Sequence, residues 1–268
     1  QAEQALAKNH RSQIESLLTQ LKDYPLYSDL LAESLEDGHA IEDFLEKYGD
    51  SRTANQLRQR WLGILADGGN WSRFFAYYQN NDGSELRCSY HYGQIKTGRS
   101  EAGYAGGESL WSAGTALPKS CDTLFDAMYR AGRLSRDKVW RRFELAMQHK
   151  KPHLAESIET YMGEDDRRIA MIWLKVHANP RMALDCAAWP VTGVLGGKIF
   201  VHALDQLAAK DVQLARSLWL GRRARFDITP EDAAHMERRL ALALALSRHA
   251  DAYPALEALS PEQNDEEV

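Results

Sequence analysis

The stretch from Tyr24 to Leu62 carries the most information about this chain. It contains Tyr24-Pro25-Leu26-Tyr27, Phe44-Leu45-Glu46-Lys47-Tyr48-Gly49-Asp50-Ser51 and Asn55-Gln56-Leu57-Arg58-Gln59-Arg60-Trp61-Leu62. Proline is favoured at the first position of a helix, where its missing N–H leaves no hydrogen bond unmade. Gly49 can end a helix, and Ser51 can cap the next one with its hydroxyl oxygen. The stretch therefore predicts short helices joined by tight turns.

The same pattern continues along the whole chain, with almost none of the alternation that is typical of strands. After a helix beginning near Ser12, we expect helices over residues 25–35, 39–48, 52–67, 71–79, 84–97, 103–113, 121–131, 135–149, 152–162, 165–177, 180–188, 194–207, 211–220, 230–248 and 251–258. Helices this short cannot each bury a face alone, so they must stack on their neighbours. The predicted class is all-α, an α-solenoid of irregular helical hairpins, since no strict repeat period and no tetratricopeptide pattern occurs.

Charge and hydropathy exclude two classes of protein. The 268 residues include 33 basic and 38 acidic side chains, a net charge of −5, which argues against a nucleic-acid partner. The longest apolar stretch, Leu240 to Leu246, is far shorter than the roughly 18 residues of a membrane span. We therefore expect neither nucleic-acid binding nor a transmembrane segment.

The opening stretch, taken with three later motifs, resembles the N-terminal helical region of the soluble lytic murein transglycosylases. These motifs are Asn70-Trp71-Ser72-Arg73-Phe74-Phe75-Ala76-Tyr77-Tyr78, Leu110-Trp111-Ser112-Ala113-Gly114 and Pro118-Lys119-Ser120-Cys121-Asp122-Thr123-Leu124-Phe125. The resemblance covers roughly the first half of the chain and fades afterwards. It implies a right-handed superhelix that forms an open ring or U shape, in a periplasmic enzyme that cleaves peptidoglycan glycan strands to 1,6-anhydro products.

In that family the chemistry belongs to a separate lysozyme-like domain, whose catalytic glutamate lies in a Glu-Ser-x-Phe motif. Glu-Ser occurs here at Glu15, Glu33, Glu108 and Glu156, but Phe never follows two places after the serine. We therefore expect residues 1–268 to be a helical domain cut short at its C-terminal end, without the catalytic domain and without catalytic residues. Gln1 is compatible with a terminus left by signal cleavage or with an artificial start.

Three cysteines are present, at positions 88, 121 and 186. The family resemblance places Cys88 and Cys121 where a disulfide is expected, and a disulfide implies an oxidising compartment such as the periplasm. Spacing alone leaves open two unpaired buried thiols. Cys186 is interpreted as a small buried apolar residue. No Cys-x-x-Cys pairing occurs, and neither a metal nor a cofactor is expected.

Other conspicuous residues have structural explanations. Five tryptophans fall inside helical patterns and are expected in the core, whereas Trp71 and Trp189 are better candidates for exposed platforms on which sugar rings stack. The glycines between Glu101 and Glu108 indicate a close helix crossing or a loop. Basic doublets such as Arg167-Arg168 are expected to be solvated or paired with acids one turn away, as Glu164 with Arg168. If several lie on one concave wall, they would match the carboxylates of peptidoglycan.

Two functional hypotheses remain. The first is a non-catalytic region of a lytic transglycosylase that positions glycan strands, with peptidoglycan and other cell-wall enzymes as partners. The second is a free-standing helical scaffold that binds a protein or peptide in its concave groove. A complete α-helical glycosidase would need an acid pair across a cleft, and the adjacent pairs here, such as Asp165-Asp166, are typical of helix starts. The residues that contact substrate are not identified.

Overall fold

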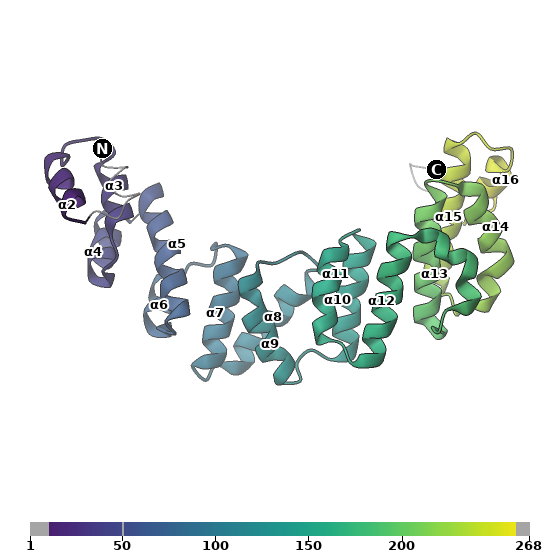
Figure 1. Ribbon diagram of the computed structural model, residues 1–268, viewed down its shortest axis with the longest axis horizontal. Helices are drawn as coiled ribbons and strands as arrows, with labels where there is room; N and C mark the ends of the chain where they lie inside the picture. The colour runs from purple at the N-terminus through teal and green to yellow at the C-terminus, as the bar shows by residue number, and fades with distance from the viewer. Residues whose placement is uncertain (1–10, 50, 261–268) are drawn as a thin grey trace. The chain divides into compact units, whose positions relative to one another are not determined.

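The computed structural model describes residues 11–49 and 51–260, and these residues form helices and turns without a strand. The chain divides into two compact units, residues 1–135 and residues 136–268. Figure 1 labels helices α2 to α9 along the first unit and α10 to α16 along the second. The predicted all-α class of irregular helical hairpins is confirmed.

The first unit contains α2 (Arg11–Gln20), α3 (Tyr27–Ser34), α4 (Gly38–Tyr48), α5 (Arg52–Asp67), α6 (Trp71–Tyr77), α7 (Ser84–Lys96), α8 (Ser100–Ser112), the 3₁₀ turn η1 (Lys119–Cys121) and α9 (Asp122–Arg130). The second contains α10 (Arg136–Gln148), α11 (Pro152–Ile158), η2 (Glu159–Tyr161), α12 (Glu164–Ala178), η3 (Pro180–Ala188), α13 (Gly193–Ala208), α14 (Val212–Arg222), η4 (Arg223–Arg225), α15 (Pro230–Leu246) and α16 (Ala252–Glu257). Most boundaries agree with the predicted ones to within three residues.

Helix starts follow local capping chemistry. Ser51 Oγ accepts a hydrogen bond from the backbone N–H of Ala54 at 3.1 Å and so begins α5. Thr229 Oγ1 accepts from the N–H of Asp232 at 3.1 Å, and Pro230 occupies the first position of α15. A cap of this kind contributes about 1 kcal/mol because it satisfies an N–H that the helix leaves unpaired.

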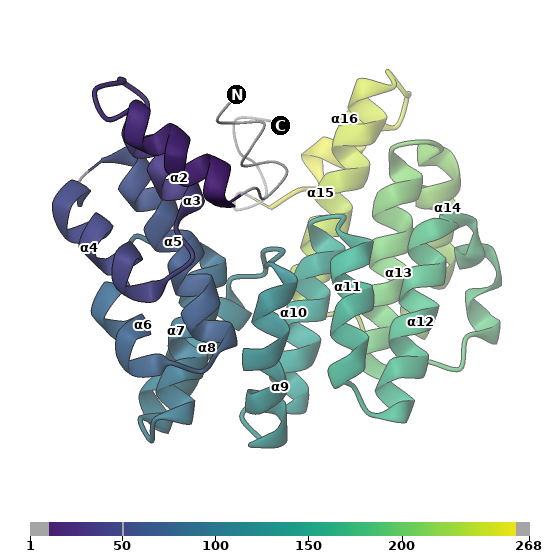
Figure 2. The same cartoon turned by 60° about the vertical axis from the view of Figure 1, so that its left-hand side comes forward.

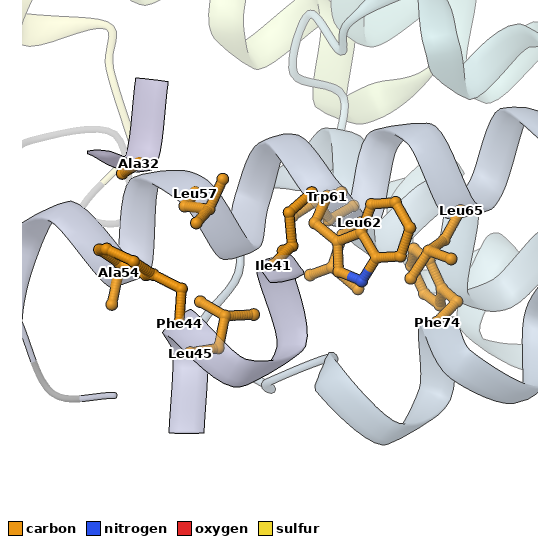
Figure 3. Close-up of a cluster of buried hydrophobic side chains, with 11 residues drawn as sticks. Ala32, Ile41, Phe44, Leu45, Ala54, Leu57, Trp61, Leu62, Leu65 and Phe74 are labelled. Atoms are coloured by element: carbon orange, nitrogen blue, oxygen red, sulfur yellow. The ribbon is translucent and has the colours of Figure 1, made fainter. Parts of the chain in front are cut away.

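One hydrophobic core cluster of the first unit lies where α4, α5 and α6 meet. Figure 3 shows Ile41 and Phe44 of α4 beside Leu57 and Trp61 of α5, with Phe74 of α6 at one end. All five side chains are buried. Burying a large apolar side chain stabilises the fold by roughly 1.5–3 kcal/mol, so this cluster is a major source of stability for the helical hairpins around it.

A buried ion pair supports the same region. The guanidinium of Arg58 donates to both carboxylate oxygens of Asp82, at 2.9 and 2.6 Å, and to the carbonyl oxygen of Tyr77 at 3.0 Å. Asp82 also accepts from the backbone N–H of Gln79 at 2.9 Å. These bonds join α5 to the loop before α7 and compensate for the loss of water around both charges.

The predicted close helix crossing is present between α7 and α8, which lie side by side in Figure 1. A Cβ atom on Gly103 would lie 2.6 Å from the carbonyl oxygen of His91, and one on Gly106 would lie 2.0 Å from the His91 ring. The glycines do not interrupt α8. The helix begins at Ser100, three residues before the predicted start at residue 103. Close packing against α7 therefore outweighs their low helix propensity.

In the second unit, α10, α11 and α12 lie side by side (Figure 2). Helix α13 packs against α12, α14 and α15, and its residues Ile199, Phe200 and Leu204 are fully buried. Gly197 allows the α14–α15 connection to approach, since a Cβ there would lie 2.5 Å from the carbonyl oxygen of Asp227. Helix α13 is consequently the central element of this unit.

One segment that was predicted as an α-helix is a 3₁₀ helix in the structure. Residues 180–188 form the 3₁₀ segment η3, in which Asp185 leaves helical geometry with φ −107° and ψ 21°. Pro180 begins the segment and has no N–H to donate, so it cannot continue the hydrogen-bonded pattern of α12 across Asn179. Along residues 11–49 and 51–260, no helix is both long and apolar enough to cross a membrane.

Candidate functional site

A cavity of about 320 Å³ lies within the second unit. Helices α10, α12, α13 and α15 and the turn after α10 contribute its walls. The lining side chains are mainly charged or amide-bearing, around the edge of one tryptophan: Glu144, Met147, Gln148, Lys150, Trp173, Lys198, Val201, His202, Asp205, Gln206, Glu231, Asp232 and His235.

One face of α13 supplies the floor of the cavity. Lys198, His202, Asp205 and Gln206 recur at spacings of three and four residues, which places them on the same side of a helix. Most of the other residues of α13 are apolar and buried, among them Ile199, Phe200 and Leu204. The fold therefore turns a polar stripe of a mostly apolar helix toward the cavity.

A second, more open cavity of about 600 Å³ adjoins the first. Both are lined by Glu144, Gln148, Lys198, Glu231 and Asp232, so together they form one groove along α10 and the start of α15. The groove displays carboxylates, ammonium groups and amides. Such a surface can hydrogen-bond a polar ligand with hydroxyl, amide or carboxylate groups.

Most charges in the groove have partners. Lys198 Nζ lies 2.5 Å from Glu144 Oε2, and Asp205 Oδ1 accepts from Arg239 Nε at 3.0 Å. The Asp205 carboxylate, 3.7 Å from His235 Nε2, raises the pKa of that imidazole. In return, His235 is the largest influence that lowers the pKa of Asp205, with Arg239 adding to it. Asp205 is therefore ionised near neutral pH and poorly suited to act as a general acid.

Two imidazoles lie close together beside the cavity. His177 Nδ1 is 3.0 Å from His202 Nε2, and Gln206 Nε2 is 3.0 Å from the same His202 atom. Burial, followed by the neighbouring His177, lowers the pKa of His202 to about 4. Burial and then the charge of Lys150 lower the pKa of His177. Both rings are therefore neutral at pH 7.

The residues singled out in the sequence have definite positions. Cys88 of α7 and Cys121 of η1 form a disulfide, with sulfur atoms 2.02 Å apart, while Cys186 is a free, buried thiol. Of the two tryptophans proposed as platforms, Trp71 is part-buried against Gly93 and Trp189 is part-buried near Phe226. Neither lines the groove.

Tryptophans and basic doublets largely behave as expected. Five tryptophans are buried in the core: Trp61, Trp111, Trp140, Trp173 and Trp219. The predicted pair of Glu164 with Arg168 is present. Arg142 is an exception, because it faces the core rather than solvent, with an exposed fraction of 3%. Burial lowers the pKa of Arg142 to about 10.

The groove was not predicted. Its walls come from helices that are distant in sequence, so no local pattern brings Glu144, Lys198 and Glu231 together. One signal was available: His202 and Gln206 are spaced by four residues on a helix whose other residues are mainly apolar. Polar residues at that spacing on a buried helix indicate a face that packs on something other than the core.

Comparisons with known proteins give one consistent result. No family model matches the chain. The soluble lytic murein transglycosylase of Escherichia coli strain K12 is 26% identical over 223 residues, which are 81% of this chain and 35% of that protein. The protein of the same name from Salmonella typhimurium strain LT2 is 27% identical over the same shares. The chain thus spans about a third of the length of these curated relatives.

Solved structures agree in fold. An inactive mutant of the lytic transglycosylase Slt from Pseudomonas aeruginosa superposes with a TM-score of 0.78 at 28% identity, covering 99% of this chain and 44% of that one. The 70-kDa soluble lytic transglycosylase of Escherichia coli gives a TM-score of 0.77 at 22% identity, covering 98% and 45%, a likeness in fold alone. The chain is therefore similar to the soluble lytic murein transglycosylases in sequence and in its all-α fold.

Proposed function

We propose that this chain is a non-catalytic helical region of a peptidoglycan lytic transglycosylase, and that it positions glycan strands or partner proteins for a lysozyme-like domain outside residues 1–268. The similarity to murein transglycosylases in both sequence and fold carries the proposal. The relatives' names supply the substrate, murein, and the reaction class, lytic transglycosylation.

The groove of the second unit suits such a role. Glycan strands present hydroxyl and acetamido groups, and stem peptides add carboxylates and amines. Lys150 and Lys198 can bind the carboxylates, while Gln148 and Gln206 can donate to or accept from the sugar substituents. Because Asp205 is ionised, it can accept hydrogen bonds from a polar ligand but has no proton to donate to that ligand. We assign the groove to substrate contact on these grounds.

We assign the protein to the periplasm. The disulfide between Cys88 and Cys121 supports this assignment, because such bonds persist in oxidising compartments and are rare in the cytosol. The murein substrate of the relatives supports it as well.

Co-sedimentation with purified peptidoglycan sacculi tests the function, with mass spectrometry of the supernatant for 1,6-anhydro fragments. We expect binding without released fragments. Released anhydro products would overturn the non-catalytic part of the proposal. A chain that neither binds nor cleaves would contradict the substrate-positioning role and favour a scaffold for proteins.

A matched pair of variants tests the groove. A Lys150→Ala/Lys198→Ala variant removes two cations that line it, and we expect its sacculus binding to fall several-fold. Lys175→Ala removes an exposed cation of α12 that does not line the groove, so its binding should equal that of the unmodified chain. Equal binding by all three proteins would exclude the groove as the contact surface.

A further inference from the structure

The charged side chains of the 320 Å³ cavity fall into two groups, those that have a partner within the fold and those that do not. Lys198 is paired with Glu144, and Asp205 is paired with both Arg239 and His235. These groups largely neutralise one another, so they contribute little net charge toward a ligand.

The charges that remain belong to Lys150, Glu231 and Asp232. Within the described part of the chain, the ammonium of Lys150 and the carboxylate of Glu231 form no hydrogen bond or ion pair. Asp232 accepts a hydrogen bond from the hydroxyl of Thr229 at 2.8 Å, which uses one of its two carboxylate oxygens. The cavity therefore offers a ligand one cation and two carboxylates.

The cation and the carboxylates lie at different ends of the cavity. Lys150 lies close enough to His177 and His202 to lower the pKa of both imidazoles. Asp232 lies near His235 and helps to raise the pKa of that imidazole. The acidic end continues into the adjoining open cavity, which Asp232 lines and Lys150 does not. The turn after α10 thus forms a positive end, and the start of α15 forms a negative end.

The backbone of Lys150 is unusual for a lysine. Its φ of 56° lies in the left-handed region, where the residue that follows a helix is most often glycine. The N–H of Lys150 donates to the carbonyl oxygen of Met147 at 3.1 Å, which holds the turn in this conformation. A side chain here strains the backbone, yet the residue present contributes an ammonium group to the cavity.

Trp173 adds a buried donor without a partner. It lines the cavity and is 3% exposed. Its indole N–H has no acceptor among the side chains and backbone groups that the structure describes. Buried donors are nearly always hydrogen-bonded, so this N–H marks a place where an acceptor on a ligand would complete the bonding of the wall.

We propose that the cavity binds a short peptide that carries both charges, with its carboxylate at Lys150 and its ammonium group at Glu231 and Asp232. The volume of about 320 Å³ is at the lower end of the roughly 300–1,000 Å³ of small-molecule sites, which suits one or two amino-acid residues. Gln148 and Gln206 also line the cavity and can hydrogen-bond a peptide group.

This inference rests on the proposed assignment of the groove to substrate contact, and it names the ligand class. The ligand is a charged peptide rather than a neutral sugar. A stem peptide attached to glycan and a free peptide could both supply an ammonium and a carboxylate.

Nuclear magnetic resonance titration of the full chain with N-acetyl-alanyl-lysine tests the two charges, because this dipeptide has one ammonium and one carboxylate. We expect saturable shifts that include the indole N–H signal of Trp173, identified by its loss in a Trp173→Phe variant. Amidation of the peptide carboxylate, or acetylation of its side-chain amine, should each raise the Kd by about three- to fivefold, as charges accessible to water contribute modestly. A neutral N-acetylglucosamine oligomer should bind more weakly than the peptide.

Variants of the chain assign each charge to its partner. Lys150→Gly removes the cation and suits the left-handed backbone, so its stability should not fall. Amidation should no longer weaken binding to this variant, whereas acetylation should weaken it as before. Glu231→Gln/Asp232→Asn should show the reverse. Lys175→Ala, at an exposed cation outside the groove, should respond to both modifications as the unmodified chain does.

Three results would overturn the inference: equal binding of the peptide and its amidated or acetylated forms, no movement of the Trp173 signal, or unchanged responses in both cavity variants. Comparison with the same peptide attached to a glycan distinguishes the two sources. A lower Kd for the attached peptide assigns the ligand to peptidoglycan, and an equal Kd assigns it to a free peptide.

The inference and the proposed function can fail separately. A chain that binds sacculi but not the dipeptide overturns the inference and leaves the proposed function standing. Dipeptide binding without sacculus binding supports the ligand class and contradicts the substrate-positioning role.

Discussion

Single residues with buried, fixed partners are the points at which one substitution should change the stability of this protein most. Arg58 and Asp82 form such a pair, since the side chain of Arg58 is 9% exposed and that of Asp82 is 1% exposed. Truncation of one member leaves the charge of the other without compensation in a medium of low dielectric. Gly103 at the α7–α8 crossing is a second example, because the backbone carbonyl oxygen of His91 occupies the space that a Cβ would need.

Replacement of Arg58 by Met should lower the free energy of unfolding by about 3–5 kcal/mol, because Asp82 stays buried without its partner. Urea denaturation followed by circular dichroism measures the change. Arg168→Met is the control, since Arg168 and Glu164 are an exposed pair worth no more than about 0.5 kcal/mol. Equal effects of the two substitutions would show that burial does not determine how much the Arg58–Asp82 pair contributes to stability.

Gly103→Ala should destabilise the protein by about 1–3 kcal/mol, since the new methyl group would overlap the carbonyl oxygen of His91. Gly63→Ala is a matched control within helix α5, where a Cβ would meet nothing within 4 Å. That change should stabilise the protein by up to about 1 kcal/mol through helix propensity. Thermal melts of both variants provide the test, and a stabilising Gly103→Ala would contradict the close crossing.

His91 should make stability depend on pH. Burial lowers the pKa of His91 below that of the unfolded chain, although its hydrogen bond with Gln94 partly opposes the shift. The unfolded chain therefore takes up this proton first, and stability present above about pH 6.5 is lost as the pH falls. Between pH 7.5 and 5.0 a His91→Gln variant should lose less unfolding free energy than the unmodified chain, as urea denaturation at the two pH values would measure. Parallel losses in both proteins would exclude His91 as the cause.

Individual elements depend on local caps and on one covalent link. The disulfide joins α7 to η1 across 33 positions, and both cysteines are buried. In the chain-entropy view, closing a loop of this size restricts the unfolded chain and stabilises the fold by about 3–4 kcal/mol. Cys186 has no part in this link, as it is free and buried in η3.

Reduction should therefore lower the melting temperature by roughly 5 to 15 °C, because the unfolded chain regains the entropy of the open loop. Differential scanning calorimetry with and without reductant measures the shift. A Cys88→Ala/Cys121→Ala variant should melt at a lowered temperature and no longer respond to reductant, whereas Cys186→Ala should respond as the unmodified chain does. A response that depends on Cys186 would refute the assigned pairing.

The positions of individual helices were the part of the structure that the sequence predicted best. Helix ends such as Ser51 and Thr229-Pro230 are set by residues next to them, so their positions could be predicted from local chemistry. The 3₁₀ geometry of η3 was missed because helix type there depends on packing as well as on Pro180. The groove was missed altogether, since packing between helices distant in sequence brings Glu144 and Lys198 together.

At the scale of the whole molecule, each of the two units has its own buried core. In helical arrays, stability is approximately a sum over elements and their nearest neighbours, so a local perturbation need not reach distant helices. The disulfide belongs to the unit of residues 1–135, and the groove and the imidazole pair belong to the unit of residues 136–268.

Reduction should therefore raise amide hydrogen exchange within residues 1–135 and leave exchange within residues 136–268 nearly unchanged. Mass spectrometry of peptides after exchange, with and without reductant, gives the comparison. A control with Arg58→Met should show the same regional pattern, because Arg58 also lies in the first unit. Faster exchange throughout the chain in either experiment would mean that the units unfold as one cooperative body.

The five buried tryptophans have an optical consequence. They lie on α5, α8, α10, α12 and α14, so each region of the array contains its own buried indole. Such indoles emit at shorter wavelengths than indoles in water, and their light moves to the red when the surrounding helices open. Replacing all but one tryptophan by phenylalanine would leave a single fluorescent indole in a chosen region. A set of such variants would then report the order in which the helices open from their emission wavelengths.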